Sequence, residues 1–277
     1  MAIEKSTLQI GPENYKFLQN YVYAEAGIVL GADKHYLFEA RLDPIVRQLR
    51  LASINDLCTL IRTCRDLPAS RQVVEAMTTN ETYFFRDPGH YDAIRHVLLP
   101  RLKEERRDTK KLRFWSAASS TGQEAYSLAM LILEESFQDW NIQILGTDFS
   151  LPVVERARSG KYQQIEVNRG LPTTLLIKHF RRSGVDWQLS DTVRRMCSFE
   201  TIDLRKSMSA LGPVDLVFCR NVMIYFDDQT KRNILKEIHG TLFRGGWLLL
   251  GGAETALGSE DWFEKRTVGN ATVYIAR

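Results

Sequence analysis

The chain has little that would support a metal centre or a disulfide framework. Its 277 residues include four cysteines and five histidines. Cys58, Cys64, Cys197 and Cys219 form no Cys-x-x-Cys pair, and the histidines form no His-x-x-x-His spacing. Reduced thiols of a cytoplasmic protein are therefore expected, and neither zinc ligation nor disulfide bonding is expected.

Long apolar runs are also missing. No stretch approaches the roughly 18 consecutive apolar residues of a membrane helix, and the N-terminal MAIEKSTLQIGPENY has no apolar core typical of a secretory signal. The net charge of +3 is too small by itself to indicate nucleic acid. These absences favour a cytoplasmic protein with no membrane insertion and no nucleic-acid partner. The length allows one large domain, or a small one beside a medium one.

The first 77 residues predict a small helical domain. Apolar residues recur at helical spacing in four stretches, at Glu13–Glu25, Lys34–Leu49, about 53–64 and about 73–77. Pro44 is expected to kink or divide the second helix, and Cys64 is expected on the inner face of the third. A bundle of this size is too small to be an obvious enzyme and suits recognition.

Three arginines of the second helix are candidates for that recognition. Arg47 and Arg50 are helical neighbours, while Arg41 points about 120° or more away from both. Residues 1–75 hold nine basic and nine acidic residues, so the region as a whole is not basic. A docking surface and an ordinary solvated helix face both fit this pattern.

The segment that follows, MTTNETYFFRDP at 77–88, places three consecutive aromatic residues among polar ones. A surface linker has little reason to carry them, and a buried loop would need partners for its polar groups. A segment folded over a ligand explains both features. Asp87 and Pro88 then predict the N-cap and first turn of a helix that runs to about Leu99.

From Lys111 onward, strand and helix patterns alternate, which predicts a mostly parallel sheet. The apolar run 112–115 passes through small residues and Gly122 into a helical pattern. Strand, small-residue turn and helix form the opening unit of nucleotide-binding α/β domains, because the turn lets a ligand approach backbone N–H groups at the helix start. Any βα unit packed in a sheet is the alternative.

Polar residues follow the later strands. Asp148 ends the strand 141–146, where a nucleotide ribose is held through its hydroxyls. An N-cap role for Asp148 is the alternative, but Ser150 is expected to fill that role. Arg220 and Asn221 leave the carboxyl end of a central strand, where α/β sheets bind ligands. The sheet is expected to close on an antiparallel hairpin, which is typical of class I methyltransferases.

Residues 162–196 break the alternation and predict an inserted subdomain that is β-rich or mixed, with a helical piece near Thr174–Phe180. Residues 161–199 hold seven basic and three acidic residues, so their net charge of +4 exceeds that of the whole chain. The positive charge is therefore local, and it marks a candidate partner surface.

Three blocks, TNETYFFRDP (79–88), SAASSTGQEAYSLAM (116–130) and FCRNVMIYF (218–226), resemble the signature blocks of CheR-type chemotaxis receptor methyltransferases. These enzymes methylate receptor glutamates with S-adenosylmethionine (SAM) and release S-adenosylhomocysteine. The resemblance implies the class I SAM-dependent methyltransferase fold, a Rossmann-like α/β sheet that ends in an antiparallel hairpin. It implies a receptor-docking all-α domain at 1–77, a SAM-covering segment at 78–98, and a catalytic domain at 99–277 with a β-subdomain inserted at about 162–196.

The resemblance also implies the site residues. SAM contacts are implied for nine positions: Asn80, Thr82, Arg86, Glu124, Asp148, Asp203, Leu204, Arg220 and Asn221. Tyr225 is implied near the transferred methyl group, and Arg86 is also a candidate for steering the acceptor carboxylate. The helical domain, with Arg41, Arg47 and Arg50, is expected to dock on the helical cytoplasmic domain of the receptor.

Two departures from the family pattern bear on these expectations. The turn reads SSTGQEAYS, whereas the family is usually close to CSTGEEPYS. Glu124 and the Thr121-Gly122 pair are retained, so we expect cofactor binding to be retained. Asp203 stands where asparagine is common. It can accept a hydrogen bond from the adenine amino group but cannot donate one to a ring nitrogen.

The chemistry asks little of side chains. A glutamate with a pKa of about 4.3 is already ionised at neutral pH, so its methylation needs no general base and no metal. Some relatives hold a receptor C-terminal pentapeptide with a glycine-rich loop of the insert. The corresponding RRSGVDWQLSDTVRR has one glycine, which favours independence from a pentapeptide. The rival functions are a SAM-binding signalling scaffold without transferase activity and a NAD-dependent oxidoreductase, for which a GxGxxG motif is missing.

Overall fold

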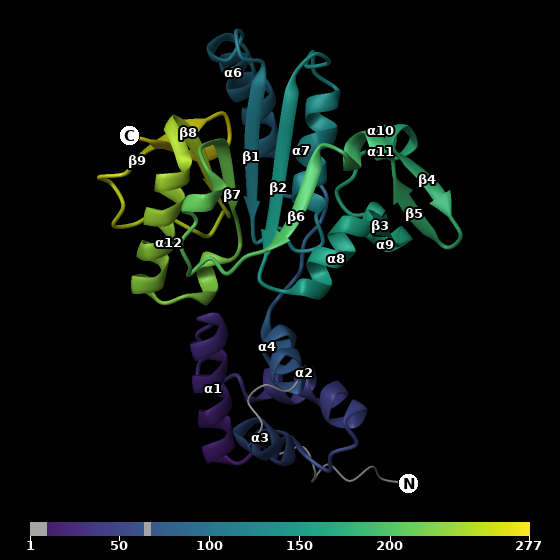
Figure 1. Ribbon diagram of the computed structural model, residues 1–277, viewed down its shortest axis with the longest axis vertical. Coiled ribbons are helices and arrows are strands. Elements are labelled where there is room, and N and C mark those ends of the chain that lie inside the picture. The colour runs from purple at the N-terminus through teal and green to yellow at the C-terminus, as the bar shows by residue number, and fades with distance from the viewer. Residues whose placement is uncertain (1–9, 64–67) are drawn as a thin grey trace. The chain divides into compact units, whose positions relative to one another are not determined.

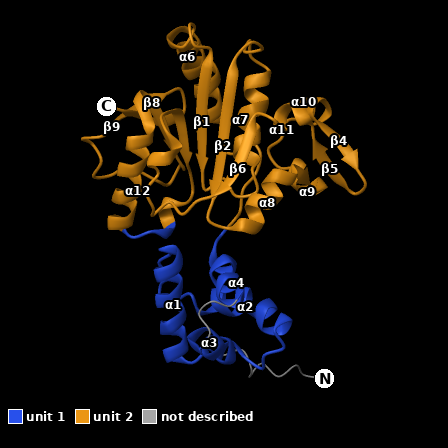
Figure 2. Cartoon of the chain, viewed as in Figure 1, with its two compact units in different colours: residues 1–79, 225–227 blue, residues 80–224, 228–277 orange. Residues whose placement is uncertain are grey.

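The structure, a computed structural model, describes residues 10–63 and 68–277. It forms two compact units, which Figure 2 colours separately. The first unit lies within residues 1–79 and also includes 225–227, and the second contains residues 80–224 and 228–277. Cys64, expected inside the third helix, lies outside the described residues.

The first unit is helical, as expected. Its helices are α1 (Pro12–Ala26), α2 (His35–Gln48), α3 (Ile54–Thr63) and α4 (Pro68–Met77). Pro44 does not divide α2. It removes one backbone donor, but Leu42, Ile45 and Val46 on its two sides are all buried, and this shared packing keeps the helix continuous.

The second unit is built on a seven-stranded sheet (Figure 1). Its strands are β1 (Lys111–Ala117), β2 (Asn141–Asp148), β6 (Cys197–Thr201), β7 (Val214–Cys219), β8 (Leu242–Leu250), β9 (Phe263–Val268) and β10 (Ala271–Ala276). Their order is β6-β2-β1-β7-β8-β10-β9. The first five are parallel, and β10 is antiparallel to both β8 and β9. The expected parallel sheet with a closing antiparallel hairpin is confirmed.

The helices of this unit are α5 (Pro88–Ala93), a π-helix (Ile94–Leu98), α6 (Leu99–Glu105), α7 (Gln123–Leu133), α8 (Leu151–Ser159) and α12 (Asp228–Thr241). The expected end near Leu99 is wrong, because the chain stays helical to Glu105. In the π turn the Leu99 N–H bonds to the Ile94 carbonyl, five residues back. This change of register accommodates the donor missing at Pro100, so the helix continues.

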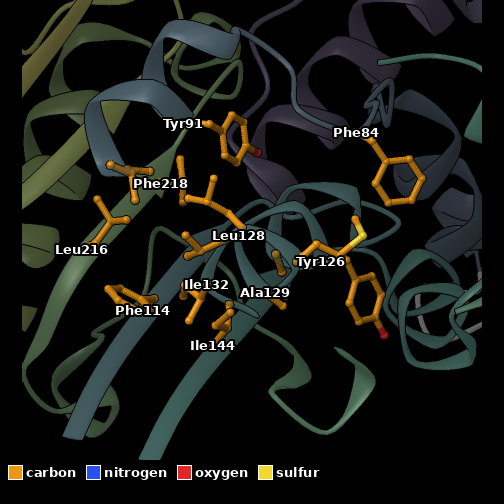
Figure 3. Packing of buried hydrophobic residues seen from close by; sticks show 14 of the residues in the cluster. Phe84, Tyr91, Phe114, Tyr126, Leu128, Ala129, Ile132, Ile144, Leu216 and Phe218 are labelled. Atoms are coloured by element: carbon orange, nitrogen blue, oxygen red, sulfur yellow. The ribbon is translucent and has the colours of Figure 1, made fainter. Parts of the chain in front are cut away.

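Helix α7 lies at the centre of the apolar core (Figure 3). Ten of its eleven residues, from Gln123 to Ile132, are buried. Leu128 and Ile132 belong to one cluster with Phe114 of β1 and Leu216 of β7. A helix that is buried almost all round is fixed rigidly on the sheet, so its first turn is a stable platform for a site.

The insert contains β3 (Lys161–Tyr162), α9 (Gln164–Val167), α10 (Thr173–His179), β4 (Phe180–Ser183), β5 (Asp186–Leu189) and α11 (Asp191–Arg194). The strands form a separate sheet in the order β3-β5-β4. The expected β-structure is present, and α10 lies at the expected helical piece, but the short helices together take up more of the segment than the strands do. Across the described residues, no helix is long and apolar enough to cross a membrane.

Candidate functional site

The carboxyl ends of five parallel strands bring their following loops to one edge of the sheet. Strand β1 lies between β2 and β7, so the chain leaves β1 in one direction and later returns to its other side. The crevice at such a reversal is where open α/β sheets bind ligands. The loops there begin at Ala118, Phe149 and Arg220, after β1, β2 and β7.

The turn between β1 and α7 is held in an uncommon backbone conformation. Ala118, Ser120 and Gly122 have φ values of 56°, 50° and 91°. The left-handed region costs a residue other than glycine about 1–2 kcal/mol. The Ser119 N–H donates to the Thr147 carbonyl (2.8 Å), which attaches the turn to the end of β2. The sequence predicted a turn of small residues, but not this strain.

Positive φ values concentrate in the three sequence blocks. Among the described residues, seven other than glycine have them, and five of these lie in the blocks: Phe85, Asp87, Ala118, Ser120 and Asn221. Such strain persists only where the surroundings hold it, and it tends to collect at functional sites. Backbone strain therefore marks the same three blocks that the motifs single out.

Asp148 connects the turn to the next loop. Its side chain accepts hydrogen bonds from the N–H groups of Ser120 (2.9 Å) and Ser150 (3.0 Å). Burial raises the pKa of this carboxyl, and the two N–H donors act in the opposite direction. Ser150 stands at the N-cap of α8, but its side chain makes no capping hydrogen bond. The expectation that Ser150 caps this helix with its side chain is wrong.

A buried ion pair joins the second and third blocks. Arg220 Nη1 lies 2.9 Å from Glu124 Oε2, and the two residues are 6% and 9% exposed. Ser116 Oγ donates to the other carboxylate oxygen (2.7 Å). Burial raises the pKa of Glu124, and the positive charge of Arg220 opposes that rise. Glu124 is therefore held by a cation and a hydroxyl at the start of α7.

The same arginine reaches the first block. Its Nη2 donates to the Arg86 carbonyl (2.7 Å) and to the carboxylate of Asp87. Asp87 occupies the N-cap of α5, but its side chain makes no capping bond. Asp87 is therefore at the expected N-cap position, but its carboxylate pairs with Arg220 and does not cap the helix. One guanidinium links all three blocks.

The first block lies on the turn and on α7, which supports its expected role as a covering segment. Ser120 Oγ donates to the Asn80 carbonyl (2.8 Å), and the Phe85 N–H donates to Ser127 Oγ (2.9 Å). Phe84 is fully buried. Arg86 differs from Arg220, since among the described residues no carboxylate forms an ion pair with it. Its charge remains available to a ligand.

Glu254 is a functional candidate that the sequence reasoning missed. Its buried carboxylate accepts hydrogen bonds from the N–H groups of Asn221 (2.6 Å), Gly251 (2.7 Å) and Ile224 (3.3 Å). It therefore holds Asn221 at its φ of 58°. The sequence signal that could have identified Glu254 was an acidic residue shortly after the Gly251-Gly252 pair that follows β8.

Unsatisfied polar atoms at this edge fit a polar ligand. Within the described residues, Asn221 Oδ1 and Ser119 Oγ are buried and have no hydrogen-bond partner. Buried polar atoms are nearly always bonded, so these two are expected to meet an external group. Asn221 was among the expected SAM contacts, and Ser119 is one of the substituted turn positions. The residues present thus fit a polar cofactor.

The remaining expected contacts are placed less closely together. The Asp203 carboxylate forms an ion pair with Arg205 (2.7 Å), and Leu204 beside it is buried. Thr82 is half-buried in the first block. Tyr225 ends the short 3₁₀-helix Met223–Tyr225 and packs within the first unit, where its carbonyl accepts from the Val29 N–H (2.8 Å). The proposed roles of these residues stay predictions.

The three arginines of the first unit differ in their surroundings. The Arg41 guanidinium donates to the carbonyls of Met77 (2.9 Å) and Thr78 (3.0 Å), at the end of α4. Arg47 pairs with Asp43 (2.9 Å), and its side chain is 77% exposed. Arg50 follows the helix with a φ of 56°. Their role in docking stays a prediction.

Comparison with known families shows to which family the chain belongs. The family model described as "CheR methyltransferase, SAM binding domain" matches residues 80–272. A second, "CheR methyltransferase, all-alpha domain", matches residues 13–78. The chain belongs to the CheR methyltransferase family. The resemblance, the class I methyltransferase fold and SAM as cofactor are thereby confirmed, and the oxidoreductase reading is set aside.

Curated relatives of this family match the chain along nearly its whole length. A "Chemotaxis protein methyltransferase" of Vibrio parahaemolyticus is 35% identical over 274 residues, which cover 97% of this chain and 98% of the relative. "Chemotaxis protein methyltransferase 1" of Pseudomonas aeruginosa is 36% identical over 272 residues, covering 95% and 98%. The relative from Borreliella burgdorferi is 30% identical and covers 92% of each chain.

Proposed function

We propose that this CheR methyltransferase transfers methyl groups to glutamate side chains in the cytoplasmic helical domain of chemotaxis receptors. The observation that carries the proposal is the arrangement of Asp148, Glu124, Arg220 and Asn221 at one edge of the sheet, in a chain whose relatives are named chemotaxis protein methyltransferases. The products are a glutamyl methyl ester and S-adenosylhomocysteine.

The cofactor is proposed to lie along the loops after β1, β2 and β7. Asp148 retains lone pairs for ribose hydroxyls, since the N–H groups of Ser120 and Ser150 each donate to a different one of its two oxygens. Asn221 Oδ1 and Ser119 Oγ offer unpaired polar atoms. The Glu124–Arg220 pair fixes the positions of the loops. When bound, SAM supplies an electrophilic methyl group on a positively charged sulfur.

The acceptor needs orientation more than activation. A bond forms between a carboxylate oxygen and the methyl carbon, while the carbon–sulfur bond breaks and its electron pair stays on sulfur. No proton moves, which agrees with the lack of histidine in the three blocks. Arg86, with no carboxylate partner, is proposed to steer the incoming glutamate or orient SAM, and Tyr225 is proposed to position the acceptor. Alignment of this kind can lower a barrier by about 7–11 kcal/mol.

One experiment tests both the reaction and the placement. The full chain is incubated with methyl-labelled SAM and a receptor cytoplasmic fragment, and base-labile methanol release is measured beside calorimetric SAM affinity. We expect methanol release from the wild-type chain. We expect Asp148→Ala to weaken SAM binding at least about tenfold, because a charged hydrogen bond is worth about 1.5–3 kcal/mol. Tyr225→Phe should lower turnover and leave SAM affinity nearly unchanged.

The outcomes separate the alternatives. SAM binding without methanol release would favour a signalling scaffold. Unchanged affinity in Asp148→Ala would remove the ribose assignment. A fragment whose glutamates are replaced by glutamine serves as the control, since an amide cannot accept the methyl group as an ester.

Receptor docking is proposed to use the helical unit with Arg41, Arg47 and Arg50, without a receptor-tail pentapeptide. The hairpin of the insert, Ser183 to Asp186, contains one glycine, and Arg182 lies 4.4 Å over the Trp187 ring beside it. The low glycine content of this hairpin supports independence from the pentapeptide. Titration with a receptor-tail pentapeptide should give no heat, and micromolar binding would contradict the proposal.

A further inference from the structure

The inserted subdomain touches the cofactor turn through one buried hydroxyl. Tyr162, in β3, is 1% exposed, and its hydroxyl donates to the carbonyl of Thr121 (2.7 Å). Thr121 stands between Ser120 and Gly122, which both have positive φ. The bond therefore fixes a peptide group at the centre of the strained turn.

The position of Tyr162 is itself closely determined. Its ring lies 5.0 Å from the ring of Phe84 in the first block, at an interplanar angle of 73°. Phe180 of the insert contacts the same phenylalanine at 5.7 Å. Behind Phe84, Gly170 leaves no space, since a Cβ there would lie 2.0 Å from the Phe84 carbonyl oxygen. The insert thus contacts both the ring and the backbone of Phe84 in the covering segment.

The turn needs such contacts to keep its shape. Left-handed residues relax toward ordinary conformations unless the surroundings hold them. Besides the bond from Ser120 Oγ to the Asn80 carbonyl, three hydrogen bonds hold the turn: Ser120 N–H to Asp148, Ser119 N–H to the Thr147 carbonyl, and the Tyr162 hydroxyl to the Thr121 carbonyl. The first two come from β2, and the third comes from the insert. Without the hydroxyl, the Thr121 carbonyl would be left buried and unpaired.

We propose that Tyr162 is a positioning residue for SAM binding, so that the inserted subdomain forms part of the cofactor site. Tyr162 acts through the turn and does not touch the cofactor. The inference rests on the proposed placement of SAM at this turn. It assigns the insert a role in cofactor affinity that is separate from any partner it binds.

Tyr126 provides a matched control. It is also 1% exposed, and its hydroxyl also donates to a backbone carbonyl, that of Ala157 (2.8 Å). Ala157 lies in α8 and not in the turn. Tyr162→Phe and Tyr126→Phe therefore remove the same group from the same kind of bond and keep both rings. The carbonyl that loses its donor belongs to the turn in the first variant and to α8 in the second.

The test measures calorimetric affinity for SAM and for S-adenosylhomocysteine, and the urea midpoint, in the full chain. Both variants should lose a similar amount of stability. Tyr162→Phe should weaken cofactor binding by about tenfold, because the free energy of one lost buried hydrogen bond then reduces the binding free energy. The cofactor affinity of Tyr126→Phe should stay within about twofold of that of the wild type. Affinity unchanged in Tyr162→Phe, or equally reduced in both variants, would overturn the positioning role.

Asp148→Ala in the same series separates this inference from the placement of the cofactor. If Asp148→Ala weakens binding and Tyr162→Phe does not, only the role of Tyr162 fails. If neither change affects binding, the placement of SAM at the turn fails as well.

Discussion

Two arginines in different units donate hydrogen bonds to backbone carbonyls, but the groups that surround the two guanidinium ions differ. Arg220 in the second unit is 6% exposed, pairs with Glu124 and Asp87, and donates to the Arg86 carbonyl. Arg41 in the first unit is half-buried and donates to the carbonyls that end α4. Among the described residues, no carboxylate forms an ion pair with Arg41.

The difference shows how a buried charge can mark a site. Arg41 satisfies carbonyls that any helix end leaves free, so its contacts explain stability without a ligand. Arg220 joins segments far apart in the sequence and lies among strained residues and unpaired polar atoms. Such a network is costly to bury and is worth more as a scaffold for binding than as a source of stability.

The largest expected effect comes from breaking the buried pair. Arg220→Ala leaves the Glu124 carboxylate buried without its cation, and such a loss costs about 3–5 kcal/mol. The free energy of unfolding from urea titration measures it. Removal of both buried charges in Arg220→Met with Glu124→Leu should recover most of that stability, because the Asp87 carboxylate that then loses its partner is 42% exposed and can be hydrated.

SAM binding by the same double variant tests the comparison between Arg220 and Arg41. The double variant should fold but bind SAM weakly, since the loops lose the guanidinium that joins them. If the double variant binds SAM as the wild type does, Arg220 is a structural residue like Arg41, and the contrast between the two units disappears.

The acid sensitivity of the second unit should exceed what its carboxylates explain. His90 is 7% exposed, and burial with the nearby charge of Arg220 lowers its pKa to about 4. An unfolded histidine has a pKa of about 6.5, so between these values the unfolded state binds a proton that the folded state does not. Stability is therefore lost as pH falls from about 6.5 to about 4, by up to about 3 kcal/mol.

His90→Gln should remove that part of the loss. Urea titrations at several pH values between 4 and 7 measure it as a flatter dependence of the unfolding free energy on pH. His96→Gln, at an exposed position on the same helical segment, should instead follow the wild-type curve. Parallel curves for wild type and His90→Gln would show that His90 takes up its proton without unfolding.

How much of this could be read from the sequence differs between the fold and the site. Strand and helix periods predicted the sheet, its closing hairpin and the helical unit, because these depend on local patterns of apolar residues. The π turn before Pro100 was missed, since a helix can absorb a proline by changing its register. In the insert, the predicted helical piece near residues 174–180 corresponds to α10. The helices α9 and α11 were missed, because helices of only four residues show no periodic pattern.

The site motifs were recognisable, but the partners of their side chains were not. The sequence assigned Asp87 to a helix cap, whereas its carboxylate pairs with Arg220, 133 residues away. Glu254 and Tyr162 escaped notice because their partners are backbone groups of distant loops. Periodicity and spacing report local structure, and contacts of this kind are created only when the sheet brings its loops together.

The smallest expected effect lies in the first unit and tests the other side of the comparison. Arg41→Ala removes a cation from the carboxyl end of α4 and should cost about 2 kcal/mol, within the range for hydrogen bonds to charged groups. Arg47→Ala removes an exposed pair with Asp43 and should change the free energy of unfolding by less than about 0.5 kcal/mol.

Neither variant should alter calorimetric SAM affinity. If receptor methylation falls in Arg47→Ala while stability and SAM affinity stay constant, Arg47 belongs to the docking surface. If methylation falls only in Arg41→Ala, and in step with stability, these arginines maintain the helical unit and the receptor contacts lie elsewhere.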